Sequence, residues 1–267
     1  LFRFYPENRH DYRRTIAEAN TILKIDPRVT GAYCRRARAY AALGDHSLAV
    51  QDIERALQLA PHDGYIMYFV GDVYNSVGNY QRAIEVLTEA IELLPKYALL
   101  YVSRSRSFYE LHEDDRALAD LTAAEALVGP TGLTASAMHR QRGDICRRRE
   151  QFSDAVGHYV KAAAANPRDA WLFVAQCDCR LALNQQTAAL ENISHAISLL
   201  PYRDHLRQRR MEIAWDLQQY SLAARDYATA VVLDATTCAG IDPETFRNVE
   251  WLWQSPSTEH TLIRVSR

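Results

Sequence analysis

The sequence contains few of the residues that interrupt helices. Its 267 residues include only 10 Gly and 9 Pro. All-β chains need many tight turns, and those turns are rich in these two residues. Their scarcity therefore favours long helices over an all-β fold. Hydrophobic residues make up 48% of the chain, which is enough for a sizeable core and excludes wholesale disorder.

Cysteine pairs, long apolar runs and an excess of one charge are also missing. The five cysteines form no CxxC, so a disulfide scaffold is disfavoured and we expect a reducing, cytoplasmic location. No apolar run reaches the roughly 18 residues that cross a bilayer. The formal net charge is −2, which argues against a sequence-independent nucleic-acid binder because such proteins usually have a basic excess.

Sequence motifs of enzyme and metal sites are absent as well. The nine histidines form no HExxH and no pair at metal spacing, and the chain has no glycine-rich phosphate loop and no GxSxG. Cys177 and Cys179 are two residues apart, so on a helix they point to different faces. We therefore expect no metal, no cofactor and no catalysis. The chain begins without Met and without a signal peptide, and we expect it to be a piece of a longer protein.

A repeat organises what is present. Small residues that open an apolar helical stripe recur in steps of 34 residues, with one step of 38; they are Thr15, Ala49, Ala83, Ala117, Ala155, Ala189 and Ala223. Twelve residues after most of them comes a proline, which ends a helix. Two apolar stripes in each unit predict a helix–turn–helix hairpin, and Gly44 and Gly78 mark the turn between its two helices.

This pattern resembles the tetratricopeptide repeat family. The match is best in GDVYNSVGNYQRAIEVLTEAIELLP, residues 71–95, and it extends over roughly residues 8–235. The resemblance implies an all-α, right-handed superhelical solenoid of about six and a half hairpins, whose first helices line a concave groove. It also implies a protein–protein interaction module without chemistry of its own.

Departures from the repeat suggest how the chain is divided. Pro6 falls where the first helix of the first unit should begin, and Asp242, Pro243 and Glu244 form a helix start. We expect a truncated first repeat at 1–27, repeats 2–4 at 28–128, an inserted loop at 129–134, repeats 5–7 at 135–235, and a capping helix with a tail at 236–267. The alternative for the last segment is that it engages the groove or a second subunit.

Two positions of the repeat change together. The seventh residue of a unit and the residue sixteen later are matched in polarity: Val70 goes with Val86, and Arg goes with Asp in three units. We predict semi-buried structural ion pairs that fix helix register; they are Arg36–Asp52, Arg104–Asp120 and Arg210–Asp226. Arg142 opposite His158 is the exception. The alternative is ordinary surface charge.

Four positions of each first helix form the stripe that faces the groove. In the middle units these positions, which also include Tyr65 and Asn75, hold the candidate peptide-binding residues Tyr68, Arg106, Tyr109, Arg140 and Arg147. Aromatic and Arg side chains are common interface anchors. We predict that the groove binds an acidic and apolar protein segment, extended or helical. The alternatives are a solvated polar face, or a ladder in which Arg38, Asp72, Arg106 and Asp144 neutralise one another.

Two other functional assignments remain open, and one is disfavoured. The chain could be a scaffold subunit of a larger assembly or the regulatory region of a longer enzyme. Family members that grip the carboxylate tail of a chaperone use a set of Lys and Asn residues. The matching positions here supply none of them, since they hold Cys34, Arg38, Phe69, Leu99 and Ser103.

Overall fold

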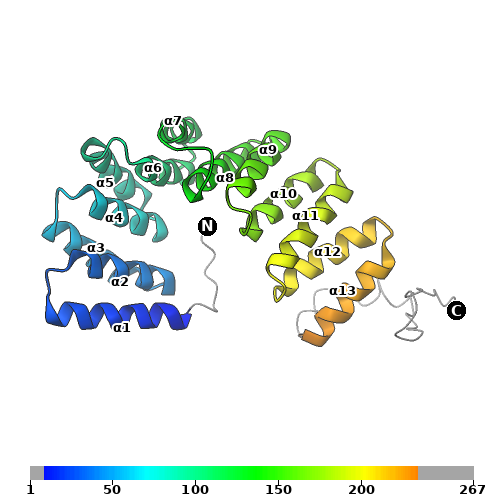
Figure 1. Ribbon diagram of the computed structural model, residues 1–267, viewed down its shortest axis with the longest axis horizontal. Coiled ribbons are helices and arrows are strands. Elements are labelled where there is room, and N and C mark those ends of the chain that lie inside the picture. Colours follow the sequence, from blue (N-terminus) through cyan, green and yellow to red (C-terminus); the bar gives the residue numbers. More distant parts are fainter. Residues whose placement is uncertain (1–8, 234–267) are drawn as a thin grey trace. The chain divides into compact units, whose positions relative to one another are not determined.

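The computed structural model describes residues 9–233, and in that range the chain forms only helices and their connections (Figure 1). The helices are α1 (Arg9–Ile25), α2 (Thr30–Leu43), α3 (His46–Leu59), α4 (Gly64–Ser76), α5 (Tyr80–Leu93), α6 (Ala98–Glu110), α7 (Asp114–Glu125), α8 (Leu133–Arg148), α9 (Phe152–Ala165), α10 (Ala170–Ala182), α11 (Gln186–Leu199), α12 (Asp204–Asp216) and α13 (Tyr220–Leu233). The all-α repeat solenoid predicted from the sequence is confirmed.

Each hairpin turns through a residue with left-handed backbone. Gly44 and Gly78 have φ angles of 89° and 81°, which glycine adopts without a Cβ clash. Four later turns place a non-glycine residue there, with φ between 58° and 61°; these residues are His112, Glu150, Asn184 and Gln218. The geometry of the turn is therefore kept even where the glycine signal is lost.

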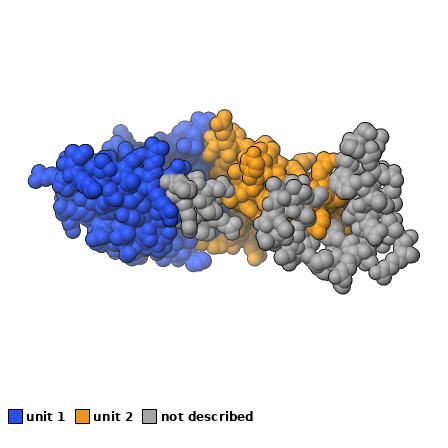
Figure 2. All heavy atoms as spheres, turned by 90° about the horizontal axis from the view of Figure 1, so that it is seen from below, with its two compact units in different colours: residues 1–145 blue, residues 146–267 orange. Residues whose placement is uncertain are grey.

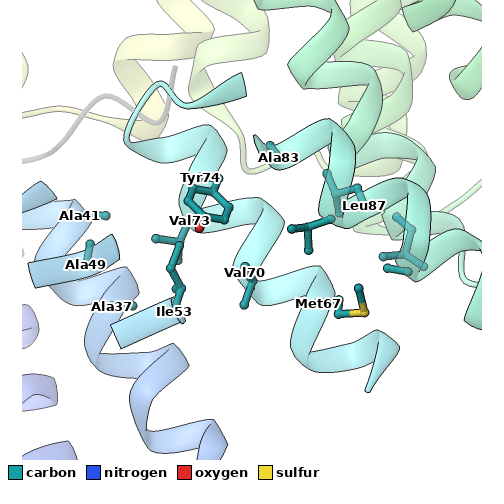
Figure 3. Packing of buried hydrophobic residues seen from close by; sticks show 13 residues of the cluster. Ala37, Ala41, Ala49, Ile53, Met67, Val70, Val73, Tyr74, Ala83 and Leu87 are labelled. Atoms are coloured by element: carbon teal, nitrogen blue, oxygen red, sulfur yellow. The ribbon is translucent and has the colours of Figure 1, made fainter. Parts of the chain in front are cut away.

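Helices pack on the partner in their own hairpin and on the next hairpin. The first helices also touch one another, α2 against α4 and α4 against α6, so they share one face. Small residues allow this close packing: a Cβ on Gly71 of α4 would lie 2.5 Å from Leu87 of α5. Figure 3 shows the core that results, in which Ile53, Val70 and Leu87 are fully buried.

The chain divides into two compact units, residues 1–145 and 146–267 (Figure 2). Unit 1 contains α1 to α7 and most of α8, and unit 2 contains the end of α8 and α9 to α13. Each unit has its own buried clusters, such as the one around Met67 and Leu100 in unit 1 and the one around Ile193 and Leu206 in unit 2.

Helix bounds can be set beside the predicted division. α7 ends at Glu125 and α8 begins at Leu133, so the connection around the predicted insertion is longer than the other connections between described hairpins. The predicted capping helix and tail at 236–267 and the break at Pro6 lie outside the described residues. Within residues 9–233, no helix is both long and apolar enough to span a membrane.

Candidate functional site

The structure brings together the two members of each predicted Arg–Asp pair. In each pair the guanidinium donates two hydrogen bonds to one carboxylate. Nε and Nη2 of Arg104 lie 2.9 and 2.7 Å from the Asp120 oxygens, and the same two bonds measure 2.7 and 2.6 Å in Arg36–Asp52 and in Arg210–Asp226. All three aspartates are buried. Hydrogen bonding to Asp52 raises the pKa of Arg36 above its ordinary value, because the bond favours the charged guanidinium.

Every one of these arginines has a third partner that the sequence reasoning missed. Nη1 of Arg36 donates to Asn20, that of Arg104 to Thr88 and that of Arg210 to Ser194, at 2.5, 3.0 and 3.4 Å. Each acceptor lies sixteen residues before its arginine, on the second helix of the preceding hairpin. The arginine therefore ties together three helices across a boundary between hairpins. In the sequence, the signal for this third partner is a short polar side chain sixteen residues before each arginine.

The exception among the pairs has a different partner from the one that the spacing suggested. Arg142 lies 2.7 Å from Glu125 and 3.3 Å from Thr122 Oγ1, both in the region of α7. Glu125 is about half exposed, with 49% of its side chain accessible. Because solvent screens such a pair, it contributes less than the buried ones.

Aromatic rings form a continuous strip on the first helices of unit 1. Tyr97, the residue directly before α6, contacts Tyr65 and Tyr68 of α4, with ring centroids 5.2 and 5.7 Å apart. Tyr68 in turn contacts Phe69 at 5.3 Å. The guanidinium of Arg38 on α2 lies 5.9 Å from the Phe69 ring. We call Tyr65, Tyr68, Phe69 and Tyr97 the aromatic strip; of its members, the sequence placed Tyr65 and Tyr68 at the groove and missed the other two.

Burial shifts the titration of two phenols of this strip, those of Tyr68 and Tyr97. It raises the pKa of Tyr68 to about 12, with a further contribution from the negative charge of Asp72, and it also raises the pKa of Tyr97. Tyr65 is the exposed end of the strip, with 56% of its surface accessible. The strip therefore presents apolar ring surface together with hydroxyl groups.

Charges beside the strip are only partly neutralised. Arg38 lies 3.5 Å from Asp72 on the next first helix, which is one step of the predicted ladder. Arg106 on α6 and Arg140 on α8 are both half-buried, and neither forms an ion pair with any residue between 9 and 233. The positive charges of Arg106 and Arg140 are thus not neutralised by an ion pair within residues 9–233.

The remaining predicted groove residues occupy different environments. Tyr109 lies on α6 and is half-buried, whereas Arg147 is exposed and belongs to unit 2. Asn75 is 2% exposed, so the prediction that it faces the groove is wrong. Its side-chain amide instead links α4 to α6 by hydrogen bonds: Nδ2 donates to the Ser103 carbonyl at 2.9 Å, and Ser107 Oγ donates to Asn75 Oδ1 at 2.6 Å.

Metal-binding side chains do not gather in this part of the molecule. Among the described residues, no group of three or more His, Cys, Asp or Glu is placed to hold a metal ion. Cys34 and Cys177 are buried, and burial raises the pKa of each thiol to about 11. Both thiols therefore remain protonated at neutral pH and are poor nucleophiles.

Comparison with known proteins agrees with the architecture. Residues 34–98 match the family model described as tetratricopeptide repeat. The structure superposes on that of the APC/C hetero-tetramer Cut9–Hcn1 with a TM-score of 0.65 at 14% identity, covering 84% of this chain and 44% of that one. The matched segment, residues 34–98, therefore consists of tetratricopeptide repeats. The TPR region of best sequence resemblance, residues 71–95, overlaps α4 and α5, and α4 carries Tyr65, Tyr68 and Phe69.

Curated relatives of the chain share only part of their length with it. Superkiller protein 3 of Schizosaccharomyces pombe is 28% identical over 104 residues, which are 39% of this chain and 8% of that protein. The tetratricopeptide repeat and J domain-containing co-chaperone DNJ1 of Cryptococcus neoformans is 25% identical over 202 residues, 76% of this chain and 34% of that one. The chain thus spans about a third or less of these relatives. In general terms, its repeats are those of protein–protein interaction modules.

Proposed function

We propose that this TPR protein is a non-catalytic module that binds an acidic and apolar segment of a partner protein through the first helices of unit 1. The observation that carries the proposal is the combination of the aromatic strip with Arg106 and Arg140. Aromatic and Arg side chains supply a large share of the binding energy in many interfaces. An uncompensated Arg is also a ready partner for carboxylates.

The charge distribution supports an acidic partner over a basic one. Asp72 is already engaged by Arg38 at 3.5 Å, whereas Arg106 and Arg140 form no ion pair within residues 9–233. Carboxylates of a partner would therefore gain charge-assisted hydrogen bonds without breaking an existing pair. The ring surface of Tyr65 and its neighbours offers the apolar contact, since 56% of Tyr65 is accessible.

Charge reversal on the first helices tests this proposal. The double variant Arg106→Glu, Arg140→Glu is compared with Arg13→Glu, Arg55→Glu, which changes net charge equally at exposed residues of the second helices α1 and α3. Partners captured by the wild type and identified by mass spectrometry should be lost with the first variant and kept with the second. Partners retained equally by both variants would contradict the proposal.

A second function, as a scaffold subunit of a larger assembly, is favoured by a different observation. Ile25 at the end of α1 is 82% exposed, and Ile22 and Val29 beside it are 37% and 36% exposed. Solenoids usually cover such apolar ends. One solved relative is a subunit of the APC/C hetero-tetramer. Replacing Ile22 and Ile25 by Ser should then abolish the binding of the other subunits of the assembly. Binding that depends on Arg106 should remain intact.

A further inference from the structure

We propose that the partner segment lies on the aromatic strip in an extended, proline-rich polyproline II conformation, with its carboxylates toward Arg106 and Arg140. This inference rests on the proposed function and specifies the ligand class of the same face. It is carried by the hydrogen-bonding state of three hydroxyl groups, those of Tyr65, Tyr68 and Tyr97.

These three hydroxyls have no acceptor within residues 9–233. The contrast is with Tyr33 and Tyr101, whose hydroxyls donate to the carbonyls of Pro27 and Pro95 at 3.2 and 3.1 Å. Burial also raises the pKa values of Tyr68 and Tyr97, as it does for Tyr74 and Tyr80 elsewhere in the unit. The strip therefore presents rings in mutual contact together with O–H groups that are available to donate.

Carboxylates next to the strip are already engaged. Asp63 accepts hydrogen bonds from the backbone N–H groups of Tyr65 and Ile66, at 2.9 and 3.1 Å, and Asp72 faces Arg38. The surface is thus rich in donors, and its nearby anionic acceptors are in use. Its complement is a ligand with free carbonyl groups and few N–H groups.

A proline-rich segment has this chemistry, and a helix does not. The polyproline II helix makes no internal hydrogen bonds, so its carbonyls are free to accept, and proline has no backbone N–H to satisfy. The carbonyls in the interior of an α-helix are bonded within the helix. Proline rings also pack on aromatic side chains, which is how aromatic-lined grooves recognise such segments. The hydroxyl groups therefore distinguish an extended ligand from a helical one.

Two fluorescein-labelled peptides of equal length and equal negative charge can separate these cases. One carries three Glu followed by a run of about nine Pro, which forms polyproline II. The other is an Ala-based helix with three Glu and with Leu at i, i+3 and i+7 spacing. Titration with the full chain, followed by fluorescence anisotropy, should show the proline peptide binding at least about tenfold more tightly, since each hydrogen bond gained contributes roughly two- to tenfold.

Removing hydroxyl groups while keeping the rings sharpens the test. The triple variant Tyr65→Phe, Tyr68→Phe, Tyr97→Phe should bind the proline peptide about tenfold or more weakly. Tyr101→Phe is the matched control and should change binding less than about twofold, because its hydroxyl is engaged by Pro95. Far-UV circular dichroism of each variant reports whether the fold is kept.

Different outcomes overturn different statements. Equal binding of the proline peptide by the wild type and the triple Phe variant overturns the inference. Tighter binding of the helical peptide, weakened by Arg106→Glu, Arg140→Glu, also overturns it but leaves the proposed function standing. If neither peptide binds and the charge reversal leaves all captured partners in place, both statements fall.

Discussion

Asp120→Ala should be one of the most damaging single changes in unit 1. Asp120 is 6% exposed and accepts two hydrogen bonds from Arg104, which also donates to Thr88. Removing the carboxylate leaves a guanidinium with only 17% of its side chain exposed and no counter-charge. Breaking a buried pair in this way costs about 3 kcal/mol or more, mainly because of the uncompensated charge.

The chain itself supplies the compensating change. The preceding hairpin holds Val70 and Val86 at the same two positions, and they are 0% and 6% exposed. The double variant Arg104→Val, Asp120→Val should therefore recover most of the loss, to within about 1 kcal/mol of the wild type, because matched apolar residues can replace a buried ion pair. Glu85→Ala, which breaks the exposed pair with Arg82, should cost less than about 1 kcal/mol.

Hydrogen exchange followed by mass spectrometry measures the effect locally, which suits a solenoid whose repeats can open separately. A loss of about 3 kcal/mol should speed exchange of the α6 and α7 amides by roughly 150-fold. Urea unfolding followed by circular dichroism gives the effect on the whole chain. The reasoning is refuted if Asp120→Ala costs less than about 1 kcal/mol, or if the double Val variant is no more stable than the single one.

Two further predictions concern packing and pH. Gly71→Ala should destabilise unit 1 by about 1–3 kcal/mol, because its Cβ would lie 2.5 Å from Leu87. Gly157→Ala has open space around its Cβ and should stabilise α9 by about 0.5–1 kcal/mol. Equal urea midpoints for the two variants would contradict this prediction. The raised pKa values of Cys34 and Cys177 add stability to the fold that is fully present below pH 9, the ordinary pKa of a thiol, and that is lost as the pH rises toward 11. Between these pH values the unfolded chain loses thiol protons that the folded chain keeps. Urea midpoints between pH 8 and 11 measure this slope, and Cys34→Ala, Cys177→Ala should flatten it.

Regularity decides how much of the molecule can be predicted from its sequence. Repetition turns one chain into several aligned copies, so helices, hairpins and the sixteen-residue spacing of Arg36 and Asp52 can be found without coordinates. The third partner of each arginine is harder to find, because it depends on how one hairpin packs on the previous one. Arg142 illustrates the point: where the connection between α7 and α8 is longer, its contacts are to Glu125 and Thr122.

The candidate site was only partly predictable for a similar reason. Position in the repeat identifies the first-helix stripe, and so Tyr65, Tyr68 and Arg106. Tyr97 lies in the connection before α6, outside any helical stripe, and it enters the site only because neighbouring hairpins bring it against α4. Asn75 occupies a stripe position, yet its amide finds buried partners on α6. Position on a helix does not reveal such contacts.

The arginines that span three helices imply that the hairpins cannot be exchanged like identical links. Excising residues 64–97, one full period, would keep the repeat pattern intact but would set Glu54 where Thr88 now accepts from Arg104. Ser107 would lose Asn75 at the same time. Shuffled or shortened versions of this chain would therefore lose native contacts between neighbouring hairpins, even though every hairpin kept its own sequence. The order of the repeats, and not only the sequence of each one, thus determines how the hairpins pack.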